Sequence, residues 1–129
     1  MIGIILVSHG KMAEGIINSA TLFFGDKIEQ MAAVSLQLED TPDDFLERLK
    51  AQIVQNDTGE GVLILADLLG GTPCNLAATL MNEHIHIISG MNLGLILEVL
   101  GLRESGNLDW NELAETAKNG IMHLNTLLD

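Results

Sequence analysis

The sequence predicts an α/β domain with a single doubly wound, mainly parallel sheet, core strand order 2-1-3-4, and helices on both faces. Two observations predict it. Continuously apolar runs without alternation, such as Ile2–Val7 and Val62–Ala66, are typical of strands buried on both faces of a sheet. Between such runs, apolar residues recur at helical spacing, so strands and helices alternate along the chain. Right-handed crossovers restrict the topology, and this strand order places a switch point between the first and third strands.

The first half of the chain is expected to hold two strands and two helices. After the first strand, apolar residues at helical spacing predict a helix over Lys11–Phe24, with Gly25 as its C-cap. A partly alternating strand is expected over Met31–Leu38. Thr41 and Asp44 then form a capping-box pattern, which predicts the start of the second helix.

Two further strands are expected at Val62–Ala66 and Ile85–Ser89. Thr72 follows the first of them after a glycine pair and is predicted as a helix N-cap, because its hydroxyl could accept from backbone N–H groups. Pro73 fits the first helical position, since proline has no N–H to leave unbonded. This helix is expected to end near Glu83.

The last third of the chain is predicted to be largely helical. A short helix is expected over Asn92–Leu102, followed by a loop over Arg103–Leu108. Asp109 and Glu112 fit the N-cap and third position of a last helix. The apolar stripe of that helix could serve the core or an interface, and it consists of Trp110, Leu113, Ala114, Ala117, Ile121, Leu124 and Leu128.

Composition restricts both the organisation and the class of protein. The 129 residues fit one domain, residues 1–129, and the net charge is −12 from 18 acidic and 6 basic residues. Such a surface would repel nucleic acid and anionic membranes and would suit a basic protein partner. A single cysteine, Cys74, excludes an internal disulfide and fits a reducing cytosol. The N-terminal apolar run is too short for a signal sequence, so a cytoplasmic protein is expected.

Two loops are expected to meet at the switch point of the sheet. Ser8, His9 and Gly10 follow the first strand, while Asp67 and a glycine turn follow the third. Because the carboxyl ends of parallel strands lie at one edge of the sheet, where ligands bind in such folds, His9 and Asp67 should converge there.

The chemistry expected of this pair is nucleophilic. His9 is both nucleophilic and titratable near neutrality, and a carboxylate that accepts from one ring nitrogen leaves the other free to attack. Asp67 is the candidate carboxylate. A phosphoryl group on His9 would then lie near the amides of Gly71 and Thr72. The glycines match neither the dinucleotide fingerprint nor the P-loop, so no nucleotide site is expected.

Three motifs carry a resemblance to a known family: LVSHG after the first strand, LADLLGGTPCN after the third, and SGMNLGLILEVL after the fourth. They resemble the enzyme IIA domain of the mannose-class (mannose/fructose/sorbose/N-acetylgalactosamine) sugar phosphotransferase system, over essentially the whole chain. The resemblance implies that His9 accepts a phosphoryl group from the phosphohistidine carrier protein HPr. His9 would pass it to a histidine of the IIB component, which phosphorylates a sugar entering through the membrane subunits IIC and IID.

The same resemblance assigns further residues. It implies that Asp67 orients His9, and that Leu69, Gly70, Gly71 and Thr72 bind the phosphoryl group or a partner. It also implies a homodimer that uses no metal and no cofactor. The sequence departs from some relatives in having Leu69 where they carry an aromatic residue. The chain ends after one domain, so the IIB component is expected to be a separate protein.

Two rival functions remain open from the sequence. Small tetrapyrrole metal chelatases also carry a His-Gly pair after the first strand, but they need further metal-binding side chains near the crevice. His84 and His86 alternate around one residue without an evident third ligand, and Cys74 has no paired base, so none of the three is expected to be a site residue. A non-catalytic regulatory module that binds an anion or a partner is the other rival.

Overall fold

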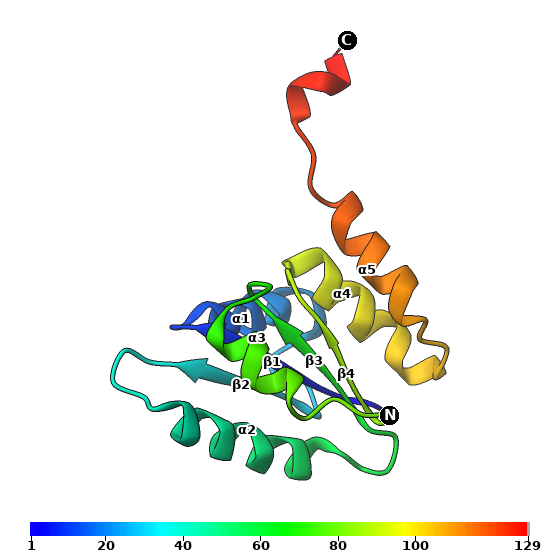
Figure 1. Cartoon of the computed structure of the whole chain (residues 1–129). Helices are drawn as coiled ribbons and strands as arrows, with labels where there is room; N and C mark the ends of the chain where they lie inside the picture. Colours follow the sequence, from blue (N-terminus) through cyan, green and yellow to red (C-terminus); the bar gives the residue numbers. More distant parts are fainter. Residues whose placement is uncertain (129) are drawn as a thin grey trace.

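The computed structural model describes residues 1–128, and a four-stranded sheet lies between two layers of helices (Figure 1). All three strand pairings are parallel, and the order is β2-β1-β3-β4, which confirms the predicted fold class and strand order. The strands are β1 (Gly3–His9), β2 (Met31–Leu36), β3 (Val62–Ala66) and β4 (Ile85–Ile88). The helices are α1 (Met12–Phe24), α2 (Pro42–Asn56), α3 (Thr72–Ala78), α4 (Leu93–Leu102) and α5 (Trp110–Asn119).

Side chains of the two central strands alternate between two cores. Ile4 and Leu6 of β1 point to the layer formed by α1, α4 and α5, whereas Ile5 and Val7 point to the layer of α2 and α3. Every side chain of β3 is buried, which explains why the sequence of this strand does not alternate. By the same alternation, Ser8 belongs to the α1 side of the sheet and His9 to the α3 side.

The expected helix caps mostly form. The Thr41–Asp44 capping box is present at the start of α2, and the Asp109 side chain accepts from two amides at the start of α5. Gly25 ends α1 with φ of 86°, in the conformation that glycine adopts without strain. None of the described helices is long and apolar enough to cross a membrane.

Several predicted boundaries are wrong, each for a local reason. β2 ends at Leu36 rather than Leu38, because the Asp40 carboxylate accepts from the amide of Gln37 and turns the chain. β4 ends at Ile88, before Ser89. α3 ends at Ala78 rather than near Glu83, where the following amides bond three residues back instead of four.

The last helix is also shorter than predicted. It ends at Asn119, and the amide of Gly120 bonds to Ala117 in a tightened final turn. Glycine is a poor helix former, which explains the stop. A short 3₁₀ helix follows at Leu124–Leu128 and stands away from the body of the molecule (Figure 1). The apolar stripe beyond Gly120 is therefore exposed and does not serve the core of this chain.

The expected loop after α4 carries a buried cation. Arg103–Ser105 forms a 3₁₀ turn, and the Arg103 side chain is only 5% exposed. Its guanidinium donates to the backbone oxygens of Ile2, Glu29 and Gln30. Arg103 thus connects the end of α4 to the segments that precede β1 and β2, at the amino ends of these strands and therefore at the end of the sheet opposite His9.

Candidate functional site

His9 and Asp67 are brought together by the pairing of β1 with β3. Val7 lies opposite Ala66 in the parallel register, and the amide of Asp67 donates to the oxygen of Val7 at 3.2 Å. His9 is the last residue of β1 and Asp67 directly follows β3, so both lie at the carboxyl ends of two adjacent strands. The predicted convergence of the two loops is confirmed.

One carboxylate oxygen of Asp67 holds His9 twice. Oδ2 lies 2.7 Å from the His9 ring nitrogen Nδ1, and it accepts from the His9 backbone amide at 2.9 Å. Because an ionised carboxylate can only accept, Nδ1 carries the proton in the neutral ring and Nε2 keeps a free lone pair. The Asp67 side chain is 9% exposed, whereas that of His9 is 48% exposed. The carboxylate is thus an internal support for a histidine that solvent can reach.

Asp67 is well suited to remain ionised. Burial alone would raise the pKa of its carboxyl, but the hydrogen bonds from the His9 amide and ring outweigh it, so the pKa lies below the ordinary value for aspartate. A carboxylate that stays negative at neutral pH favours positive charge on the imidazole. It would therefore stabilise a ring that becomes cationic during a reaction at Nε2.

Ser8 fixes the turn that follows His9, a role that the sequence interpretation missed. Its buried hydroxyl donates to the oxygen of Gly10 at 3.0 Å and accepts from the amide of Ala13 at 2.8 Å. It thereby caps the start of α1, whose N-cap residue Lys11 has no capping side chain. The sequence did contain a signal for this capping role, because Ser8 is a hydroxyl residue near the end of a strand and shortly before a helix.

The glycine pair after β3 has two different requirements. Gly70 has φ of 84°, a conformation that other residues rarely adopt. Gly71 has an ordinary φ of −79°, but a Cβ there would lie 2.7 Å from Cε1 of His9. Gly71 therefore has to lack a side chain because the imidazole packs directly against its backbone.

Two details of this turn differ from expectation. The amide of Gly71 already donates to the oxygen of Leu68 at 3.2 Å, within the turn itself. Gly71, not Thr72, is the N-cap of α3, because Gly71 takes the extended conformation of that position and Thr72 is already helical. The Thr72 hydroxyl therefore does not cap the helix, and its side chain is exposed to solvent.

Exposed apolar side chains lie on the loops around His9. Leu68 is 58% exposed and Leu69 is 79% exposed, both in the loop after β3. Met12, in the first turn of α1, is 45% exposed. Contiguous exposed apolar side chains are typical of a surface that another protein covers.

The other candidate side chains do not join this site. His86 stacks on the ring of Trp110, with centroids 4.4 Å apart, and His84 is exposed beside Glu83. Cys74 is buried in the first turn of α3, within the α2 and α3 core. Within residues 1–128, no three His, Cys, Asp or Glu side chains gather as they would around a metal ion.

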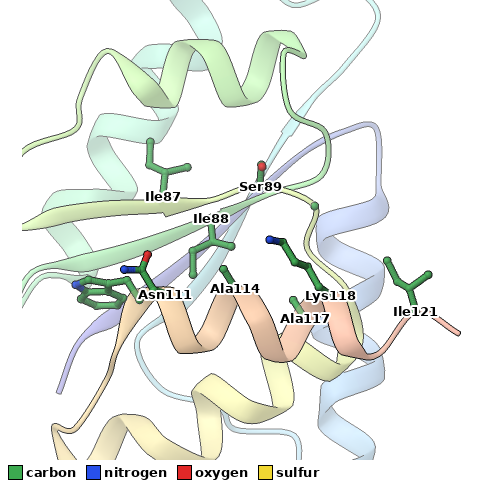
Figure 2. Close-up of a pocket in the computed structure, with 10 residues that line it drawn as sticks. Ile87, Ile88, Ser89, Asn111, Ala114, Ala117, Lys118 and Ile121 are labelled. Carbon is green, nitrogen blue, oxygen red and sulfur yellow. The ribbon is translucent and has the colours of Figure 1, made fainter.

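A separate cavity of about 430 Å³ lies along the outer side of β4 (Figure 2). Figure 2 shows Asn111, Ala114, Ala117 and Lys118 on the α5 side and Ile87, Ile88 and Ser89 on the β4 side. Neither the His9 loop nor the Asp67 loop lines this cavity, so it is not part of the histidine site.

The fold and the site together define a class: a small doubly wound α/β protein that presents a carboxylate-oriented histidine at the switch point. Comparison with known proteins makes the class specific. Residues 3–118 match the sequence profile of the family described as PTS system fructose IIA component. The chain belongs to this family, the mannose-class enzyme IIA components of the sugar phosphotransferase system.

Relatives of known name agree with this assignment. The chain is 31% identical over 106 residues to the PTS system fructose-specific EIIA component of Bacillus subtilis, covering 81% of this chain and 72% of that protein. It is 30% identical over 129 residues to the PTS system mannose-specific EIIAB component of Escherichia coli, covering 95% of this chain. It spans only 39% of that relative's length.

A solved structure agrees with the fold over nearly the whole chain. The PTS IIA protein associated with the fucose utilization operon from Streptococcus pneumoniae superposes with a TM-score of 0.91 at 27% identity. The match covers 98% of this chain and 96% of that one.

Gly71→Ala should displace the His9 ring without unfolding the protein. The added methyl group would contact Cε1 of His9, so the Nδ1 hydrogen bond to Asp67 should lengthen or break. We expect the NMR signal of the His9 Nδ1 proton to move or disappear. Gly101→Ala is the matched control, because a Cβ at that helical position contacts nothing within 4 Å. An unchanged His9 signal in Gly71→Ala would contradict the packing described here.

Proposed function

We propose that the chain is the phosphoryl carrier of a sugar phosphotransferase system and that His9 carries the phosphoryl group. In this proposal, phospho-HPr is the donor and a histidine of the IIB component is the acceptor. The single observation that carries the proposal is the double hydrogen bond of Asp67 to His9, which leaves Nε2 free and accessible. Membership in a phosphotransferase family supports the same chemistry.

The transfer would proceed by nucleophilic attack of Nε2. Its lone pair forms a bond to the phosphorus of phospho-HPr while the P–N bond of the donor breaks, and the electron pair stays on the donor's nitrogen. The His9 ring keeps its Nδ1 proton and becomes cationic, and the carboxylate of Asp67 stabilises that cation. Transfer to IIB reverses these steps at Nε2. No metal or cofactor takes part in the proposed steps.

Residues around the histidine supply candidates for phosphoryl and partner binding. The exposed Thr72 hydroxyl is not used as a helix cap, so it is proposed as a donor to the phosphoryl oxygens. Leu69 and the glycine turn are proposed to contact the partner, together with Leu68 and Met12. The net charge of −12 favours partners with basic surfaces.

The organisation of the wider system remains a prediction. We propose that residues 1–129 act as one enzyme IIA domain, with IIC and IID as membrane subunits reached through the IIB component. The cytoplasmic location expected from the sequence also stays a prediction. The chelatase and regulatory-module alternatives gain no specific support from the geometry.

A phosphorylation assay tests the carrier function. Phosphoenolpyruvate, enzyme I and HPr should place an acid-labile phosphate on this protein, and His9→Ala should abolish the labelling. Asp67→Asn should lower the rate of labelling by roughly 100-fold or more, because the orienting carboxylate is lost. The matched control is His84→Ala, since His84 is exposed and lies just before β4, at the end of the sheet opposite His9. A folded parent that stays unlabelled with competent donors would leave the regulatory module and the chelatase to be tested by anion and metal titration.

A homodimer is the second part of the proposal. β4 is an edge strand, and the cavity between it and α5 is lined largely by apolar residues. The same chain carries an exposed apolar C-terminal segment, residues 121–128, that stands away from its own body (Figure 1). Because each copy offers both a groove and an apolar segment, two copies related by a two-fold axis could cover both exposed surfaces.

The double variant Leu124→Asp with Leu127→Asp should convert the dimer to a monomer. Both side chains are more than 60% exposed in the single chain, so the substitutions should not disturb the folded core. Light scattering coupled to gel filtration would measure the mass. The control is Leu22→Asp, an exposed residue on α1. A monomeric parent would contradict the proposed dimer, and a dimeric double variant would exclude this segment as the interface.

A further inference from the structure

Lys11 stands out among the few cations of this chain. Only six residues are basic, and four of them are already engaged by carboxylates or backbone oxygens: Arg48 with Asp40, Lys50 with Glu47, Lys118 with Glu115, and Arg103 with three carbonyls. Within the described part of the chain, the other two, Lys11 and Lys27, have no carboxylate within 4.0 Å of their ammonium groups, and of these two only Lys11 is close to His9 in the sequence. Lys11 lies two residues after His9, and its side chain is exposed.

The position of Lys11 is unfavourable for the helix that it begins. Lys11 is the N-cap residue of α1, where its side chain makes no capping hydrogen bond. The N-terminus of a helix favours negative charge, so the positive charge of a lysine is unfavourable there. Ser8 performs the capping instead, through its hydroxyl. The only acidic residue of the first turn, Glu14, accepts from Ser35. Local folding therefore gives no reason for a cation at this position.

A phosphoryl group on His9 would supply that reason. The Cα atoms of His9 and Lys11 are at most about 7.6 Å apart, because two trans peptide units separate them. The four-carbon stem of lysine is flexible, and it can carry its ammonium toward a group on the exposed imidazole. A phosphoryl group adds roughly two negative charges next to the carboxylate of Asp67 and in a strongly acidic protein.

We propose that Lys11 binds the phosphoryl group carried by His9 and favours the phosphorylated state of this protein over phospho-HPr. This inference rests on the carrier function proposed above. The ammonium neutralises part of the negative charge that arrives with the phosphoryl group, which lowers the free energy of the phosphorylated protein and of the transfer transition state. In the unphosphorylated protein, none of the described carboxylates lies within 4.0 Å of the Lys11 ammonium, so Lys11 stabilises that state less.

The equilibrium of phosphoryl transfer tests this proposal. Labelled phospho-HPr is mixed with the full chain, and the ratio of the two phosphoproteins at equilibrium is measured at low and at high salt. Lys11→Met keeps the length of the side chain and removes its charge. We expect it to shift the equilibrium toward phospho-HPr by about two- to fivefold at low salt, the range of an exposed ion pair. The shift should shrink at high salt, where screening weakens the attraction.

Two further variants provide the controls. Lys11→Arg retains the charge and should restore the equilibrium to within about twofold of the parent. Lys27→Met makes the same change of net charge, but Lys27 lies between α1 and the start of β2, at the end of the sheet opposite His9. This variant should leave the equilibrium unchanged. The unfolding free energy of Lys11→Met should equal or exceed that of the parent, because a charge of the wrong sign leaves a helix N-terminus.

The outcomes separate this inference from the carrier function. If the parent is phosphorylated on His9 and Lys11→Met reaches the same equilibrium, Lys11 does not bind the phosphoryl group and the carrier function stands. If Lys11→Met destabilises the fold in urea and Lys11→Arg fails to restore the equilibrium, the effect is structural and the inference is overturned. If the folded parent takes up no phosphate at all, both proposals fail.

Discussion

The site of this protein depends on one shared oxygen atom. Oδ2 of Asp67 accepts from both the backbone amide and the ring of His9, so a single carboxylate fixes the position of the residue and the orientation of its imidazole. One of these hydrogen bonds comes from the backbone amide of His9, the last residue of β1, and Asp67 directly follows β3. The register between β1 and β3 therefore sets the position of the carboxylate relative to His9. The pairing of the two buried strands thus determines which nitrogen of the solvent-exposed His9 ring carries the proton.

Two neighbouring residues, Ser8 and Gly71, help to hold the His9 ring in place. Ser8 fixes the turn after His9 through two hydrogen bonds, and Gly71 leaves room for Cε1 by having no side chain. Leu68, Leu69 and Thr72 are exposed beside this pair and are the residues proposed to contact the phosphoryl group or a partner. This separation suits the proposed carrier function, in which one histidine meets a donor and then an acceptor, because the exposed residues can vary without disturbing the His9–Asp67 pair.

Much of this could be predicted from the sequence, and the failures have physical causes. Apolar runs at strand length gave the buried strands, and parallel topology then required His9 and Asp67 to meet, which the structure confirms. Thr72 was misplaced by one position because Gly71 takes the extended N-cap conformation more readily. Gly71 and Arg103 act through contacts with residues up to 101 positions away, which a local pattern cannot reveal. Ser8 bonds only to nearby residues, and the local signal for its capping role was overlooked. The last helix was overextended because its apolar pattern continues past Gly120 into residues 121–128, whose side chains are exposed.

The most direct test of the account concerns which ring nitrogen carries the phosphoryl group. Because Nδ1 of His9 is hydrogen-bonded to Asp67, phosphorylated protein enriched in ¹⁵N should show a phosphorus–nitrogen coupling at Nε2 of His9. The proton on Nδ1 should stay there, hydrogen-bonded to Asp67. Phosphorus–nitrogen and proton–nitrogen NMR spectra of the same sample would measure both. Phosphate on Nδ1 of His9, or on any other residue, would contradict the orienting role assigned to Asp67 and with it the proposed mechanism.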